Sequence, residues 1–544
     1  MLTLENLIEK GYLPQEVIPP LNTESLAAAL PTINANLHTF TSPRSTKCDI
    51  YSLPRLKNFR RVLGIPNPLH QVKLSKTIVD NWADISTFLA QSDISISTPL
   101  VAPNSTRAVV AFRDFSDVKF ERALRSTSAR YLLRVDISRF YHSIYTHCIP
   151  WVLHTKAVAK ANRGSSLWGN VIDTDVRNTR DGQTMGIPIG PDTSRIISEI
   201  ISVGIDLNLK QRVPNLVGVR HVDDFWLYFK SLADLEMGYS AIQYTLQEFE
   251  LELNPTKAKV IELPEVFDEK WVHELQSFRF RNKTSAQRND LISYFNLAFQ
   301  NAVIFPDDYV LQYALVKATQ NVVAPENWDI FEALLLRTII VEPKVLPIVL
   351  RIFLTYQNQG YTLNLQKILE TVEQLLEYHC KLSHSFEVSW GLWFCRALKL
   401  TLSSTVADLV SKVDDSVTAL VALDLESSGL TTTRLDKTMW QKHINTDGLN
   451  SEYWLLAYEA NVKGWLSHRT GHDYIGGNSF FNMLRANNVS FYDESKEVDL
   501  VDIFTTSVEV SLPFDLSSLI EDLNTEDLAV IPVTEGLTED DLPF

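Results

Sequence analysis

Two adjacent aspartates, Asp223 and Asp224, lie in the segment "RHVDDF" (220–225) near the middle of the chain. The apolar runs "LVGV" before the segment and "WLYF" after it predict two short strands, with the aspartates at the turn between them. Adjacent carboxylates repel each other, so the segment needs a positive group nearby. A pair of aspartates alone is more often a turn or a helix cap than a catalytic site.

A third carboxylate changes that balance. In "YLLRVDISRFYHSI" (131–144), Asp136 stands at the end of a strand-like run and directly before a helical-looking segment. An aspartate where a strand ends is well placed to project into a cleft, and three converging carboxylates require divalent cations. Two Mg²⁺ ions about 3.5–4 Å apart, with Mn²⁺ as the alternative, would activate a 3′-hydroxyl and stabilise leaving pyrophosphate.

With these carboxylates the chain resembles the reverse transcriptases. Asp136 matches the first catalytic carboxylate of their palm domain, and "HVDDF" matches the second, which is normally Tyr-x-Asp-Asp. Tyr141, five residues after Asp136, stands where these enzymes use a bulky aromatic to exclude a ribose 2′-hydroxyl. The resemblance therefore implies deoxynucleotides (dNTPs) as the substrate.

Two further segments resemble motifs that bind the triphosphate. In "LKNFRRVLGIPNPLHQ" (56–71), Arg61 matches the arginine of the fingers motif, with Arg60 and Lys57 as helpers. Cationic side chains there would neutralise the phosphates of the incoming nucleotide. In "LELNPTKAK" (251–259), Lys257 matches the lysine that protonates pyrophosphate, and Lys259 is the substitute if the register differs.

The stretch "QTMGIPIGPDTSRIISEI" (183–200) resembles the segment that packs under the nascent base pair. The matching positions are Gly186, Pro188, Gly190 and Ser194. Ile189 replaces the usual glutamine of this segment, and His221 replaces the usual tyrosine of the Asp-Asp motif. Both departures leave the metal chemistry intact and put template-guided copying in doubt.

The segments "FYHSIYTHCIPWVLHTKAVAK" (140–160) and "GGNSFFNMLRANNVSFYD" (476–493) resemble the bacterial abortive-infection reverse transcriptases. That family consists of phage-defence enzymes with a polymerase-like amino-terminal half and a helical-repeat carboxy-terminal half. Related branches of defence-associated reverse transcriptases begin with a segment similar to "GYLPQEVIPP" (11–20), so the resemblance does not decide the subtype. The resemblance implies homo-oligomers in a bacterial cytoplasm.

The elements that must position these residues fall into two classes. Residues 1–285 mix strand-like and helical stretches, which predicts an α+β domain of the fingers and palm type. Residues 286–490 predict an all-α, HEAT-like repeat domain, because apolar residues recur there at three- and four-residue spacing. The clearest helical stretches are 290–303, 309–322, 328–340 and 365–378.

The charge is concentrated at one end of the chain. Of the net charge of −16, residues 491–544 carry −14, so the other 490 residues are near neutral. This acidic C-terminal tail is expected to be a solvated extension, or else a nucleic-acid mimic or regulatory arm. Four scattered cysteines without a CxxC pair argue against a zinc site or a disulfide framework and fit a reducing compartment.

No segment predicts a membrane span or a signal peptide. The apolar run 338–356 contains five charged or proline residues, and the first residues carry early acidic side chains. We therefore expect a soluble, intracellular protein.

Three functions follow as hypotheses. The resemblance implies a template-independent DNA polymerase that extends a protein hydroxyl, leaving single-stranded DNA covalently attached. Tyr12 and Tyr51, in proline-flanked sequence, are the candidate priming residues. The alternative is an RNA-templated reverse transcriptase that uses a dedicated non-coding RNA to make repetitive DNA. The third is an inactive scaffold whose helical half binds a phage component.

Overall fold

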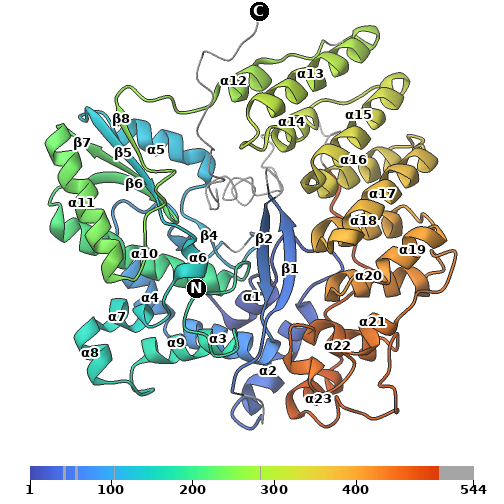
Figure 1. Cartoon of the computed structure of the whole chain (residues 1–544), viewed down its shortest axis with the longest axis horizontal. Coiled ribbons are helices and arrows are strands. Elements are labelled where there is room, and N and C mark those ends of the chain that lie inside the picture. Colours follow the sequence, from blue (N-terminus) through green and yellow to red (C-terminus); the bar gives the residue numbers. More distant parts are fainter. Residues whose placement is uncertain (41–43, 56–58, 103, 282, 502–544) are drawn as a thin grey trace, which may run out of the picture.

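The computed structural model describes residues 1–40, 44–55, 59–102, 104–281 and 283–501. Lys57 and most of the acidic tail lie outside these ranges. Figure 1 shows the amino-terminal half on one side of the molecule, the hairpin of β1 (Asp49–Pro54) and β2 (Arg60–Ile65) in the middle, and the later helices in an arc along the other side. None of the helices in the described ranges is long and apolar enough to cross a membrane.

The amino-terminal half contains a four-stranded antiparallel sheet, which we call the palm sheet. Its spatial order is β6-β7-β5-β8. The strands are β5 (Tyr131–Asp136), β6 (Val217–His221), β7 (Asp224–Phe229) and β8 (Lys259–Glu262). The two apolar runs around the adjacent aspartates are therefore strands, as the sequence predicts.

Both faces of the palm sheet are covered, which explains why β7 is buried along its whole length. Leu133, Val135 and Leu227 face a core shared with α10 (Asp192–Arg212) and α11 (Leu232–Glu248). Leu132 and Trp226 belong to a smaller cluster with Val118 of α5 (Val118–Arg125). Successive residues of a strand point to opposite faces, so a continuous apolar run serves two layers.

The other elements of this half surround the sheet and the hairpin. They are α1 (Leu4–Glu9), α2 (Glu24–Asn36), α3 (Pro68–Asp80), α4 (Trp82–Leu89), α6 (Phe140–Ser143), α7 (Cys148–His154), α8 (Lys156–Ala161), α9 (Trp168–Asn178), β3 (Pro99–Leu100) and β4 (Val110–Ala111). β3 and β4 pair with each other in an antiparallel ladder.

The fingers hairpin consists of β1 (Asp49–Pro54) and β2 (Arg60–Ile65), which pair antiparallel. Its buried side chains, among them Tyr51 and Leu63, belong to the same hydrophobic core as the later helices and not to the core of the palm. β1 packs against α18 (Ser385–Ala397). The hairpin is thus joined to the helical region by apolar burial.

The carboxy-terminal region is mostly helical, as predicted, and the residues described there after β8 contain no further strand. Its helices are α12 (Lys270–Ser277), α13 (Thr284–Ile304), α14 (Val310–Ala318), α15 (Trp328–Val341), α16 (Leu346–Asn358), α17 (Leu365–His379), α18, α19 (Ser404–Val410), α20 (Ser416–Ser427), α21 (Thr438–Gln441), α22 (Trp454–Val462) and α23 (Ser479–Ala486). All four helical stretches named from the sequence are helices. The repeat character stays a prediction.

The folded body extends past the predicted start of the tail at 491. Phe491 and Tyr492 are fully buried, and the Tyr492 hydroxyl donates to Asp424 Oδ2 at 2.9 Å. Tyr492 also forms an isolated antiparallel bridge with Leu21, near the amino terminus. The predicted start of the tail is therefore too early in the chain. The acidic composition of residues 491–544 gave no sign that Phe491 and Tyr492 pack into the body.

Candidate active site

The adjacent aspartates lie at a tight turn between β6 and β7. His221 pairs with Asp224 across the ladder, so Val222 and Asp223 form the loop. Val222 has φ 53°, a left-handed conformation that β-branched residues rarely adopt. Three hydrogen bonds hold it: its N–H donates to Ser97 Oγ at 2.8 Å, and its carbonyl accepts from Arg220 Nη1 at 3.0 Å and from Ser202 Oγ at 3.4 Å. The surrounding contacts maintain this strained backbone.

Arg220, near the end of β6, holds the turn in place through buried ion pairs. It is fully buried and forms ion pairs at 2.8 Å with both Glu199 and Asp206 of α10. Ser95 and Ser97 donate to Glu199, which completes the network. Breaking one member of a buried ionic network leaves an uncompensated charge, so this network fixes the position of the turn relative to α10.

The third carboxylate joins this pair through the palm sheet. Asp136, the last residue of β5, lies directly opposite Asp224 in the β5–β7 ladder. One carboxylate oxygen from each of Asp136, Asp223 and Asp224 lies within 4.8 Å of the others. All three side chains are buried. The structure therefore brings together the three carboxylates that the sequence predicts to converge.

The electrostatics of the cluster favour a bound cation. Burial, and then the charge of Asp136, raise the pKa of the Asp224 carboxyl. Burial also raises the pKa of Asp136, although the Lys257 ammonium opposes this. Among the described residues, the buried oxygens Asp136 Oδ2 and Asp224 Oδ2 accept no hydrogen bond. Hard oxygen ligands with unused lone pairs fit Mg²⁺ or a similar divalent ion.

Lys257 lies beside the cluster, with its Nζ 3.2 Å from Asp136 Oδ1. It precedes β8, which pairs with β5, and the Asn254 N–H donates to the Asp136 carbonyl at 2.8 Å. Lys259 is exposed within β8 and has Arg134 as its ladder partner. The register therefore places Lys257, the first choice from the sequence, at the carboxylates.

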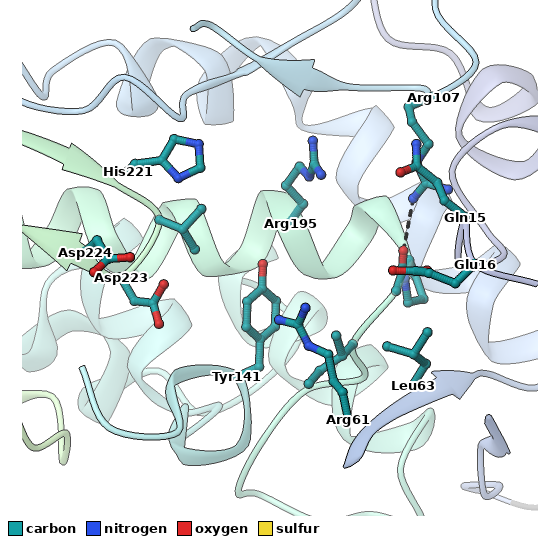
Figure 2. A pocket seen from close by; sticks show the side chains of 14 residues that line it. Gln15, Glu16, Arg61, Leu63, Arg107, Tyr141, Arg195, His221, Asp223 and Asp224 are labelled. Carbon is teal, nitrogen blue, oxygen red and sulfur yellow. Dashed lines mark hydrogen bonds between the residues drawn. The ribbon is translucent and has the colours of Figure 1, made fainter. Parts of the chain in front are cut away.

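A pocket opens beside Asp223 and Asp224 (Figure 2). Tyr141 of α6 lies in its middle, and its hydroxyl accepts a hydrogen bond from Ser198 Oγ at 3.2 Å. Arg61 of β2 and Gly190 of the loop before α10 also line the pocket. Tyr141, Arg61 and Gly190 are thus brought together with the carboxylates.

The loop that carries Gly190 is held by a buried ion pair that the sequence analysis missed. Arg107 Nη2 donates to the Gly190 carbonyl at 2.9 Å, and Arg107 pairs with Asp192 at the start of α10. Gly190 has φ 122°, and a Cβ there would lie 2.6 Å from Pro14. Arg107 and Asp192 are 85 residues apart, so local sequence carries no signal for their pairing.

The pocket has further lining residues that the sequence analysis did not single out. They are Gln15, Glu16, Leu63, Arg107, Pro191 and Arg195. Arg195 directly follows Ser194, which the sequence analysis named. Ile189 and His221, which mark the departures from the usual motifs, line the pocket as well. Burial lowers the pKa of His221 to about 3, so its imidazole is neutral there.

Arg60 requires a correction. It does not help Arg61 at the pocket, because adjacent residues of a strand point to opposite sides. Its guanidinium instead binds Glu387 of α18 through Nη1 and Nη2, with Nη2 2.9 Å from Oε2, and it also donates to Ser52. Lys57, the other predicted helper, lies outside the described residues.

The two candidate priming tyrosines also require a correction, since both are fully buried. Tyr51 lies in β1, not in a loop, and its hydroxyl is hydrogen-bonded to Ser389 Oγ at 2.9 Å. The Tyr12 hydroxyl donates to the Pro66 carbonyl. Burial raises both pKa values well above that of free tyrosine, which opposes formation of a nucleophilic phenolate.

Comparisons with known proteins agree with this geometry. A family model described as reverse transcriptase (RNA-dependent DNA polymerase) matches residues 61–285, the range that contains Arg61, Tyr141 and all three carboxylates. A search of curated proteins found no match.

Among solved structures, the chain is similar to telomerases. Apo telomerase from Candida tropicalis is 13% identical at a TM-score of 0.30, with 77% of this chain and 74% of that chain covered. Candida albicans telomerase in complex with a TWJ fragment of telomeric RNA is 12% identical at 0.30, covering 72% and 66%. A truncated Candida tropicalis telomerase is 13% identical at 0.30, and the alignment covers 44% of this chain and 56% of that one.

Because these TM-scores are low, the family match and the site carry the assignment. Residues 61–285 form a reverse transcriptase domain, a class of domain that carries nucleotidyltransferase activity.

Proposed function

We propose that this chain is a magnesium-dependent DNA polymerase that adds dNTPs through Asp136, Asp223 and Asp224. The observation that carries the proposal is the convergence of three buried carboxylates beside a pocket lined by an aromatic and an arginine. Bound divalent ions would there lower the pKa of an attacking hydroxyl and neutralise the negative charge of the leaving pyrophosphate.

The residues around the cluster suit the other requirements of this reaction. Arg61 would bind the phosphates of the incoming nucleotide. Lys257, next to Asp136, would give a proton to the pyrophosphate as it leaves. The Tyr141 ring would fill the space that a ribose 2′-hydroxyl needs, which selects deoxynucleotides.

We further propose that synthesis is untemplated and starts on a protein hydroxyl. Outside the tail the chain is near neutral, which is a poor basis for gripping a long duplex through phosphate contacts. A tethered primer avoids that requirement by its high effective concentration. The hydroxyl must be one other than those of Tyr12 and Tyr51.

A phenol extraction tests the priming step. Purified chain supplied with dNTPs and Mg²⁺ should yield DNA that stays with the protein in the phenol phase until a protease releases it. DNA that partitions as free nucleic acid without protease would refute protein priming, whereas an inactive preparation would count against the polymerase itself.

The alternative is RNA-templated synthesis, favoured by the description of the matching family as RNA-dependent DNA polymerases. Sequencing the product with and without co-purified RNA separates the two. A product complementary to that RNA supports templating, and a product unaffected by ribonuclease supports untemplated addition.

From the resemblance of residues 140–160 and 476–493 to abortive-infection enzymes, we propose a role in phage defence as a homo-oligomer. Cells that express the wild-type chain should reduce phage plating, and cells that express Asp223→Asn should not. Light scattering of the purified chain tests the oligomer.

A further inference from the structure

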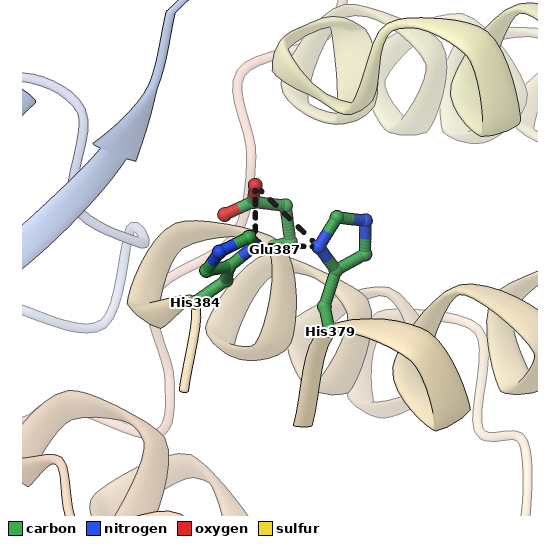
Figure 3. A group of neighbouring side chains, drawn as sticks. All are labelled: His379, His384 and Glu387. Atoms are coloured by element: carbon green, nitrogen blue, oxygen red, sulfur yellow. Dashed lines mark hydrogen bonds and ion pairs between the residues drawn. The ribbon is translucent and has the colours of Figure 1, made fainter. Parts of the chain in front are cut away.

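Two histidines and a glutamate form a second cluster of metal-ligating side chains, far from the palm in sequence. His379 ends α17, His384 precedes α18, and Glu387 lies in the first turn of α18 (Figure 3). The sequence offered no cysteine pattern for a metal site. The corner between these two helices brings together the residue types that zinc favours instead.

The three ligand atoms converge on one point. His379 Nδ1 lies 2.9 Å from His384 Nδ1 and 3.6 Å from Glu387 Oε1, and His384 Nδ1 lies 3.5 Å from the same oxygen. In a tetrahedral zinc site with bonds of about 2.0–2.1 Å, neighbouring ligand atoms are about 3.3 Å apart. The two distances to Glu387 Oε1 are close to this spacing, and the shorter distance between the two Nδ1 atoms is a hydrogen bond that a bound ion would replace.

The two histidines are partly open to solvent. The His384 side chain is 23% exposed and that of His379 is 12% exposed, which leaves room for an ion and a water molecule to approach. A histidine binds metal through a neutral ring nitrogen.

Arg60 supplies an outer partner for the carboxylate. Its Nη2 donates to Glu387 Oε2 at 2.9 Å, and Ser52 of β1 holds the same guanidinium. Arg60 also donates to Oε1 through Nη1, so Oε1 would bind a cation through its other lone pair while Oε2 keeps its hydrogen bond to Arg60. Outer hydrogen bonds of this kind orient metal ligands.

We propose that His379, His384 and Glu387 bind one Zn²⁺ ion, with water as the fourth ligand. The ion fastens the corner between α17 and α18 and, through Glu387 and Arg60, connects this corner to the fingers hairpin. The site is separate from the catalytic carboxylates, which offer only oxygen ligands.

Zinc titration of the untagged chain tests the proposal. After treatment with a chelator and dialysis, the wild type should take up one equivalent of Zn²⁺, measured by elemental analysis. His379→Gln and His384→Gln should each weaken binding more than about 100-fold, because even the loss of an outer partner costs roughly 10–100-fold. His472→Gln, at an exposed histidine elsewhere, is the matched control and should bind as the wild type does.

Two measurements locate the ion independently. Co²⁺ in the wild-type chain should give the intense visible absorption of a tetrahedral site, and this measurement needs no variant to fold. Asp223→Asn should keep the full equivalent of Zn²⁺. The proposal is overturned if the wild type takes up no zinc, if the histidine variants bind it equally well, or if Asp223→Asn abolishes uptake.

Discussion

The palm sheet and the fingers hairpin are both small antiparallel sheets, yet they are held by different cores. The palm strands pack on α10 and α11, whereas β1 and β2 share the core of the helical region. The carboxylates are therefore positioned by the palm alone, and Arg61 is positioned by a strand that the helical region supports. Leu63 of the core shared with the helical region and Tyr141, which packs against the palm core, both line the pocket, so the helical half can influence the pocket through the hairpin.

The largest effect should come from the palm side of this comparison. Asp136→Asn and Asp223→Asn should each reduce dNTP incorporation by about 100-fold or more, because each removes a charge from the metal-binding cluster. Asp408→Asn, at an exposed position of α19, is the control. Full activity in either palm variant would contradict the polymerase assignment.

Arg220→Met should lower the free energy of unfolding by about 3–5 kcal/mol, because Glu199 and Asp206 would stay buried without their partner. Incorporation should also fall, since Val222 loses a hydrogen bond that holds the turn. Denaturant unfolding checks the first effect. The exposed pair of Arg212 and Glu248 gives a control, and Arg212→Met should cost less than about 1 kcal/mol.

Tyr141→Ala should raise the ratio of ribonucleotide to deoxynucleotide incorporation by about 10-fold or more, because a steric wall of the pocket is removed. Tyr141→Phe keeps the ring and should leave the ratio close to that of the wild type. An unchanged ratio in Tyr141→Ala would mean that the ring only packs.

The two adjacent arginines of β2 test the two regions separately, because Arg61 lines the pocket and Arg60 binds Glu387 of the helical region. Arg61→Gln should raise the KM for dNTPs by about 10-fold, through the loss of a charge-assisted hydrogen bond to phosphate. Arg60→Gln should leave KM unchanged and lower the free energy of unfolding by about 1–3 kcal/mol, because Glu387 loses its partner. If Arg60→Gln raises KM as much as Arg61→Gln does, the hairpin does not separate the two roles.

The smallest effect should follow removal of residues 502–544, which carry eleven acidic and no basic side chains. The cut leaves Val498 and Tyr492 in place, so folding and incorporation should stay within about 2-fold of the wild type. A steep, salt-dependent gain in DNA affinity would instead show that the tail occupies a basic groove.

The sequence by itself determined the carboxylates, the strands around them and the change to a helical second half. These features are local: a strand that ends in aspartate, a turn with two more, and helices with apolar spacing each follow from a few neighbouring residues. Asp136 was predicted in this way, whereas Tyr141 and Lys257 were predicted from the resemblance of their segments to reverse transcriptase motifs.

Only the tertiary structure decided which arginine faces the pocket, which tyrosines are buried, and which distant side chains meet. Arg60 and Arg61 are chemically alike, and the pleat of β2 together with the packing of α18 distinguishes them. The pairs of Arg107 with Asp192 and of Arg220 with Glu199 join residues far apart along the chain, as does the contact of Arg60 with Glu387. Such contacts depend on how cores pack, which a local pattern does not encode.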